Sequence, residues 1–247
     1  MIPATRIPPA CATPEVIAAA RAHALAEWPR EAVGAVTPAG YVALPNRSAE
    51  PEQRFRVVDQ DLAGLEILAL IHSHTAGQAQ PSSADMAQQI AMALPWGIIL
   101  TDGEVAADPF WFGDQCAPAA LEGRLFRSGV TDCFALVRDW WAVERGVVIP
   151  DVPRDWGWWV SDGAPARDLI GSNAARCGFS LVGRGPEVEI QAGDVLALRN
   201  AGVAVPYHTG VAIGDGLMLH HFHGRLSRPD VLAPWLRSHP LVFRHHG

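Results

Sequence analysis

The sequence predicts an α/β domain followed by an α+β domain, and three observations predict it. Helix-like segments are interspersed among strand-like segments in the first half, which favours an α/β layout. The second half opens on one helix-like segment and continues in strand-like segments, an order typical of a helix packed on a small antiparallel sheet. Between the halves both patterns stop. We therefore expect domains at residues 1–115 and 129–247, joined by a linker at 116–128.

Composition argues against nucleic-acid binding and membrane insertion. The chain has 247 residues, 49% of them hydrophobic, so it can bury one large core or two small ones. Its formal net charge is −7 and no basic block is present, which disfavours a phosphate-binding face. The chain has no apolar run of about 18 residues, and its N-terminus lacks the apolar core of a signal peptide. Its widely spaced cysteines are expected to be reduced thiols.

The first half is expected to form two helices and several short strands. In order, the expected elements are a helix at 14–28, a hairpin at 32–36 and 41–44, a buried strand at 66–73, a helix at 83–94, and strands at 96–100 and 110–112. Thr13 can cap the first helix, Pro14 suits its first turn, and Pro29 ends it. The buried strand carries His72 and His74 to its C-terminal end.

The second half is expected to place one helix on a sheet that contains a hairpin. The expected elements are a helix at 133–145, a strand at 195–198, and a hairpin at 209–213 and 217–221. The hairpin turns at a Gly-Asp-Gly sequence, which suits a tight turn. The tryptophan-rich stretch at 156–159 has no periodicity, so it either covers the core or lines a groove.

Several polar residues of the first half have the composition of an open zinc site. His72 and His74 lie two apart on a strand, so both rings can face one ion. Asp85 falls in the first turn of the next helix and completes three ligands, which leaves a position for water. Glu31 can take the proton of that water, and Ser82 can hydrogen-bond the oxyanion of a tetrahedral intermediate. The alternative is a histidine pair satisfied by hydrogen bonds, with Asp85 as a helix cap.

This pattern resembles the JAMM/MPN metalloprotease family. The motif is His-x-His, seven residues, Ser, two residues and Asp, with a glutamate upstream, and the resemblance covers roughly residues 10–112. It implies a JAMM/MPN-like α/β fold, bound zinc, and an isopeptidase or amidase activity. Some relatives have lost the motif and serve only as scaffolds, and the intact motif argues against that loss here.

A second set of residues suits thiol catalysis. Cys133 opens a helix, where the helix dipole is expected to lower the pKa of the thiol. His208 starts one hairpin strand and would act as the base. His220 lies twelve residues later, across the turn, and would fix the tautomer and orientation of His208. The backbone amide of Cys133 could contribute to an oxyanion hole. The alternative is a buried cysteine that serves packing, with surface histidines.

The segments Asp-Cys-Phe-Ala-Leu-Val-Arg-Asp, Gly-Asp-Val-Leu-Ala-Leu and His-Thr-Gly-Val-Ala-Ile-Gly-Asp-Gly-Leu-Met-Leu-His resemble the NlpC-type, papain-like cysteine peptidases over about residues 129–235. The resemblance implies a papain-like α+β fold and cleavage of stem peptides of peptidoglycan, next to D-glutamate and a diamino acid. Many relatives have a tyrosine just before the cysteine segment, but this chain has only Tyr41 and Tyr207. His221 is a rival for His220, although its side chain should face the other side of the strand.

A JAMM-type domain fused to an NlpC-type domain resembles the tail assembly protein K family of long-tailed bacteriophages and prophages. That resemblance implies synthesis in the bacterial host cytoplasm, a place at the tail tip, contact with other tail-tip proteins, and action on peptidoglycan peptides in the host periplasm. Two alternatives stay open. One is a structural assembly factor with vestigial sites, and the other is processing of ubiquitin-like modifiers.

Overall fold

The computed structural model describes residues 3–75, 78–160, 166–200 and 202–247. The chain divides into two compact units, one formed by Thr5–Pro118 and the other containing Ala119–Gly247. Each unit has its own sheet and its own hydrophobic core. The division falls inside the linker expected at 116–128, while the domain limits themselves stay a prediction.

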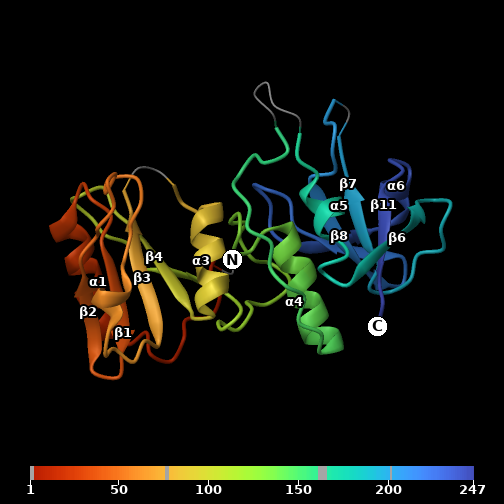
Figure 1. The fold of residues 1–247 in the computed structure, drawn as a ribbon. Helices are drawn as coiled ribbons and strands as arrows, with labels where there is room; N and C mark the ends of the chain where they lie inside the picture. Colours follow the sequence, from red (N-terminus) through yellow and green to blue (C-terminus); the bar gives the residue numbers. More distant parts are fainter. Residues whose placement is uncertain (1–2, 76–77, 161–165, 201) are drawn as a thin grey trace. The chain divides into compact units, whose positions relative to one another are not determined.

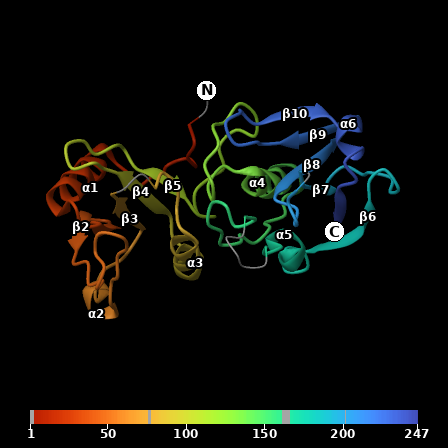
Figure 2. The same ribbon diagram turned by 90° about the horizontal axis from the view of Figure 1, so that it is seen from above.

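The first unit is a mixed five-stranded sheet with helices on both faces (Figures 1 and 2). Its strands run in the order β2-β1-β3-β4-β5; β3 and β4 are parallel, and the other neighbours are antiparallel. Its elements are α1 (Pro14–Glu27), β1 (Val33–Thr37), β2 (Gly40–Leu44), α2 (Asp59–Leu62), β3 (Ala69–His74), α3 (Ser83–Met92), β4 (Trp96–Leu100) and β5 (Phe110–Phe112).

Strand β3 divides its side chains between the two faces of this sheet. Ala69 and Ile71 pack in the core with Val16, Ala20 and Ala24 of α1. Because side chains alternate along a strand, the histidines of β3 turn toward the opposite face. That face carries α3, so the fold brings the paired imidazoles to the start of that helix (Figure 2).

The second unit is a helix packed on a six-stranded sheet, which confirms the expected α+β class. Its strands run in the order β10-β9-β8-β7-β11-β6, all antiparallel. Its elements are α4 (Cys133–Arg145), α5 (Leu169–Asn173), β6 (Phe179–Arg184), β7 (Val195–Leu198), β8 (His208–Gly214), β9 (Leu217–His220), β10 (Arg228–Val231), α6 (Ala233–Leu236) and β11 (Leu241–His245).

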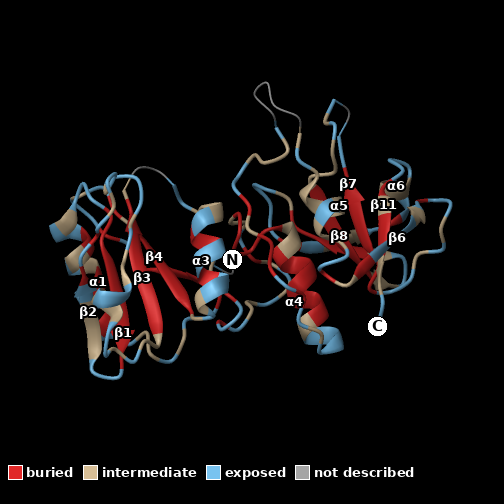
Figure 3. Ribbon diagram, viewed as in Figure 1, coloured by how far each residue is buried: buried red, intermediate tan, exposed pale blue. Residues whose placement is uncertain are grey.

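Helix α4 is buried along its first turns and exposed at its last (Figure 3). Leu136, Val137 and Trp140 pack against strand residues that include Val195 and Val211. Asp132 caps the helix by accepting a hydrogen bond from the Ala135 amide, and Gly146 ends it in the left-handed region with φ 67°. The helix N-terminus is thus fixed within the core, so its first residue has a defined position.

The sheet of the second unit is larger than the sequence analysis expected. Strands β6, β10 and β11 were not among the expected elements, and β11, from the end of the chain, lies between β7 and β6. In the first unit, the strand expected at 66–73 begins only at Ala69, and the helix expected at 83–94 ends at Met92 because Ala93 adopts φ 51°. No helix in the described part of the chain is long and apolar enough to cross a membrane.

Candidate metal and thiol sites

Two histidines and an aspartate converge at the end of β3. Nε2 of His72 lies 3.1 Å from Nε2 of His74, and Asp85 oxygens lie 3.6 Å from the first ring and 3.4 Å from the second. All three side chains are buried. Strand β3 supplies the rings and the first turn of α3 supplies the carboxylate, so the structure brings the predicted ligand set together.

The spacing of the two ring nitrogens and the Asp85 carboxylate oxygens fits a tetrahedral zinc ion. Ligands about 2.0–2.1 Å from one ion at tetrahedral angles lie roughly 3.3–3.4 Å apart, close to the observed separations. Nδ1 of His74 lies 2.9 Å from the Gln78 carbonyl oxygen, so Nδ1 carries a proton and Nε2 keeps its lone pair for a metal. The His72 ring is held by Phe55 and Trp96, at centroid distances of 4.7 Å and 5.6 Å. The donor set therefore fits zinc.

Ser82 and Asp85 form a capping box at the start of α3. The Ser82 hydroxyl donates to Asp85 Oδ2 at 2.7 Å, and the Asp85 amide donates to Ser82 Oγ at 3.1 Å. These bonds orient the carboxylate toward the two rings. Because the only hydroxyl hydrogen of Ser82 is used on Asp85, an oxyanion contact by this residue requires that bond to break first.

Glu31 lies just before β1 and is buried. Burial raises the pKa of Glu31 to about 7; the charges of His74, which lowers it, and Asp85, which raises it, also reach this carboxyl. Its position beside the ligand cluster follows from pairing, because Val33 lies opposite His72 in the antiparallel pair of β1 and β3. The structure thus places the predicted base next to the predicted ligands.

Cys133 is the first residue of α4, as predicted, but its thiol is not acidified. Burial raises the pKa of the Cys133 thiol to about 11, and the neighbouring Asp132 carboxylate adds to the rise. The expectation of a lowered thiol pKa is therefore wrong, because desolvation and the adjacent negative charge raise the pKa by more than the hydrogen bonds with Thr209 and the charge of Arg154 lower it. Within the described residues, no hydrogen bond joins this thiol to His208.

His208 and His220 form a hydrogen-bonded chain that continues to a third residue. Nε2 of His208 lies 3.2 Å from Nδ1 of His220, and Nε2 of His220 lies 3.0 Å from Oδ2 of Asp230. Burial lowers the pKa of His208 well below its usual value, with the His220 and His221 charges adding to the effect. His221 is not part of this series of hydrogen bonds, because its Nε2 lies 3.1 Å from the Arg225 carbonyl oxygen.

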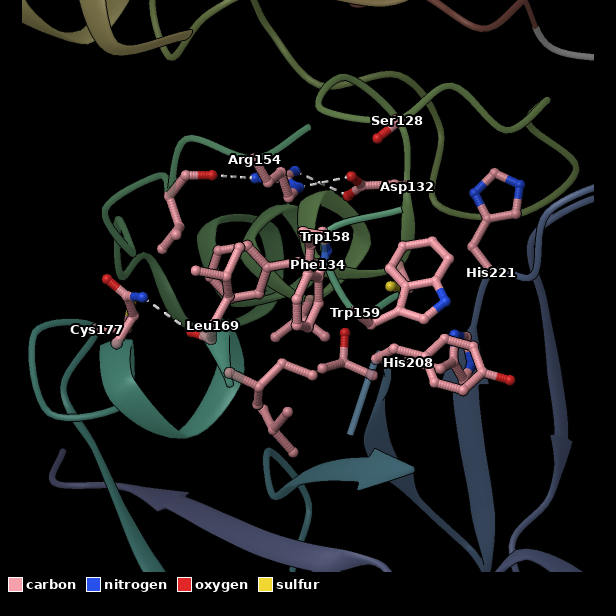
Figure 4. A pocket seen from close by; sticks show the side chains of 18 of the residues that line it. Ser128, Asp132, Phe134, Arg154, Trp158, Trp159, Leu169, Cys177, His208 and His221 are labelled. Carbon is pink, nitrogen blue, oxygen red and sulfur yellow. Dashed lines mark hydrogen bonds and ion pairs between the residues drawn. The ribbon is translucent and has the colours of Figure 1, made fainter. Parts of the chain in front are cut away.

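Cys133 and His208 line one cavity of about 120 Å³, whose other walls are mostly aromatic and aliphatic (Figure 4). The tryptophan-rich stretch contributes Trp156, Trp158 and Trp159 to the lining of this cavity. Of the two roles expected for the stretch, it therefore has the second. The lining residues Asp132 and Arg154 pair with each other at 2.7 Å. A carboxylate that entered this cavity would lose its hydration, and the Arg154 guanidinium that could compensate is already paired with Asp132. The cavity therefore suits an uncharged part of a substrate.

A buried ion-pair network contains Asp132, the residue that precedes Cys133. Arg154 donates to both oxygens of Asp132, at 2.7 and 2.9 Å, and to Asp151 at 2.8 Å. Arg138 lies 3.0 Å from the second Asp151 oxygen. Because Asp132 is the N-cap of α4, the network fixes the backbone that carries Cys133.

Comparison with known proteins places both halves of the chain in known families. Residues 13–112 match the model of prokaryotic homologs of the JAB domain, and residues 109–242 match the NlpC/P60 family. Tail tip assembly protein K of Escherichia phage lambda is 35% identical over 183 residues, which are 74% of this chain and 83% of that protein. The chain belongs to the tail tip assembly protein K family.

A second member of the K family gives a similar result. Tail tip assembly protein K of Escherichia phage N15 is 30% identical over 87% of this chain and 87% of that protein. Among solved structures, an NlpC/P60 family protein from Bacillus cereus is 14% identical, with a TM-score of 0.32 over 88% of this chain and 64% of that one.

Sequence reasoning missed two residues at the thiol site of this K family member. Asp230 follows a stretch with no periodic signal, and only the pairing of β10 with β9 brings it to His220. Arg154 precedes the tryptophan-rich stretch, and its role depends on the burial of two aspartates. The proline in Arg-Pro-Asp gave no positive signal for a strand, because a sheet tolerates proline only at an edge, which is where β10 lies.

Replacing Arg154 with methionine is expected to destabilise the second unit of this K family member by about 3–5 kcal/mol, because the buried Asp132 carboxylate loses its arginine partner and Asp151 loses one of its two. Burial by itself raises the pKa of Asp132 and Asp151, but arginine charges outweigh it and hold both below the usual value. Their stabilisation is therefore present above about pH 4 and is lost as the pH falls toward the folded-state pKa values. The difference in the free energy of unfolding between Arg154→Met and wild type should therefore become smaller in acid. Urea unfolding between pH 3 and 7 measures it.

A matched control removes an exposed partner in the same unit. Arg228→Gln breaks a half-exposed pair with Asp230 and is expected to cost less than about 1 kcal/mol. Equal losses for Arg228→Gln and Arg154→Met, or a difference independent of pH, would contradict the role given to the buried network.

Proposed function

We propose that this chain is a bifunctional amide hydrolase of a phage tail. Its second unit is a cysteine endopeptidase, and its first unit is a zinc-dependent amidase or isopeptidase. The observation that carries the proposal is that Cys133 and His208 line one cavity while His208 is bonded to His220. The buried three-ligand cluster supports the zinc-dependent part.

Peptide cleavage by the second unit begins with a neutral thiol, because its pKa is about 11. Substrate binding brings Cys133 within reach of His208, whose Nδ1 takes the thiol proton as the sulfur attacks the amide carbonyl carbon. The Cys133 amide donates to the oxyanion. The C–N bond then breaks, His208 returns the proton to the leaving nitrogen, and water cleaves the thioester to give the acid.

In the first unit, His72, His74 and Asp85 would hold zinc. The ion, when bound, lowers the pKa of a coordinated water and polarises the substrate carbonyl. Glu31, buried next to this cluster, takes the proton of the attacking water and passes it to the leaving nitrogen. Ser82 contributes to the oxyanion only if its hydroxyl leaves the Asp85 carboxylate.

Peptidoglycan stem peptides are the proposed substrate of the cysteine unit, from its membership of the NlpC/P60 family. The apolar cavity would hold the uncharged part of the peptide and leave carboxylates at its rim. Because two relatives are named tail tip assembly proteins, we place this chain at the tail tip, with other tail-tip proteins as partners. It would be made in the host cytoplasm and act in the host periplasm.

Glu31→Gln is expected to lower amide hydrolysis by the first unit by about 10²–10⁴-fold, since the neutral amide cannot accept a proton. Zinc content should stay unchanged, because Glu31 is not one of the three clustered ligands. The measurement is release of new amino termini from wall fragments and tail proteins, in a Cys133→Ala background with added zinc. Stem-peptide cleavage in the Cys133-intact Glu31→Gln variant serves as the control, and a parallel loss there would refute two separate sites.

A structural assembly factor with idle sites is the second candidate. The raised thiol pKa and the lack of a thiol–imidazole bond among the described residues favour it. Phage carrying both Cys133→Ala and Glu31→Gln decides between the two functions. Fully infectious particles would support the assembly factor, whereas normally assembled tails that fail to infect would support the hydrolase.

A further inference from the structure

The side chains of His208, His220 and Asp230 lie in a diagonal line on one face of the second sheet. Gly210 pairs with His220 across β8 and β9, and Met218 pairs with Asp230 across β9 and β10. Residues two apart on a strand share a face, so each of the three side chains lies diagonally across from the next. Diagonal neighbours of this kind are within reach of long polar side chains, which accounts for the observed 3.2 and 3.0 Å contacts.

The donors and acceptors in this line allow one arrangement of protons when both rings are neutral. The Asp230 carboxylate only accepts, so Nε2 of His220 must carry a proton. Nδ1 of His220 then has the lone pair and accepts from Nε2–H of His208. The lone pair of His208 is left on Nδ1, the atom that the proposed reaction uses as a base.

We infer that Asp230 is a positioning residue that fixes the tautomer of His208 through His220. The inference rests on the proposed thiol mechanism and adds a residue that touches neither the thiol nor the substrate. Without the carboxylate, His220 can turn or exchange its proton between nitrogens. His208 would then spend part of its time with Nδ1 protonated, a form that cannot accept the thiol proton.

The protonation state of His220 makes the hydrogen-bonded line of His208, His220 and Asp230 depend on pH. The groups that face His220 come from each element around it: His208 on β8, Asp230 and Arg228 on β10, Arg225, and the ring of Trp235. Burial lowers the pKa of His220, Asp230 raises it, and the two arginines lower it. A protonated His220 donates from Nδ1 to His208 and forces the unproductive tautomer. Activity should therefore fall on the acid side as His220 gains its proton.

Asp230→Asn is expected to lower kcat/KM for stem-peptide cleavage by about 10–100-fold. Loss of the carboxylate next to a catalytic histidine costs about 10⁴-fold in a serine protease, and here one ring stands between. The acid limb of the pH–rate profile should move to lower pH, because the variant removes the group that raises the pKa of His220. Arg228→Gln should move the same limb to higher pH. A merely structural role for Asp230 would change the rate without moving the limb.

Nitrogen-15 NMR of the imidazole rings tests the tautomers without any substrate. Wild type should show the proton of His208 on Nε2, Asp230→Glu should keep that form, and Asp230→Asn should show a mixture. A wild-type proton on Nδ1 of His208, or an unchanged spectrum in Asp230→Asn, would overturn the inference. Should wild type cleave no stem peptide, the proposed function fails, while the spectra still decide the role of Asp230.

Discussion

Cys133→Ser is expected to abolish cleavage of stem peptides by the second unit, with kcat/KM lowered by at least about 10⁴-fold. A serine hydroxyl is far less acidic than a thiol, and burial holds the pKa of His208 well below its usual value. This weak base therefore cannot remove a hydroxyl proton at a useful rate. The measurement is release of new amino termini from purified wall fragments under reducing conditions.

The matched control is Cys177→Ser, because Cys177 lines the same cavity but its thiol donates to the Pro150 carbonyl oxygen, 3.7 Å away. Its variant is expected to retain cleavage. Wild-type rates in Cys133→Ser would assign the reaction to another nucleophile. Equal losses in both variants would instead point to the integrity of the cavity.

His74→Ala is expected to remove bound zinc, from about one ion per chain to none in the purified protein. His74 is one of three ligands, and even residues that only hold a ligand in place change metal affinity by about 10–100-fold. Loss of the ligand itself should exceed that range. Elemental analysis after dialysis against a weak chelator measures the zinc, and zinc-dependent protection against thermal unfolding gives a second reading.

His23→Gln provides the control in the same unit. Its ring lies 2.9 Å from the Tyr41 hydroxyl, and it is not part of the ligand cluster. It should keep full zinc content. Zinc retained by His74→Ala would show that the ion binds elsewhere in the chain, and zinc absent from wild type would remove the basis for a metallopeptidase.

Local patterns in the sequence were enough for the elements that position both sites. The helix expected at 133–145 has the same bounds as α4 in the structure, because the spacing of its apolar residues is a local property of the sequence. The spacing of His72, His74 and Asp85 predicted their convergence, because strand alternation and a short return to the next helix are local properties. The hairpin of β8 and β9 likewise follows from its turn sequence.

Non-local contacts decided the rest. The thiol pKa depends on burial and on Asp132. His220 reaches Asp230 only because β10 pairs with β9. Chain spacing does not encode how deeply a group is desolvated or which strand becomes its neighbour. The residue types and their order thus determined the family and the two candidate chemistries, whereas tertiary packing determined the protonation states, since these depend on local dielectric and on charges distant in sequence.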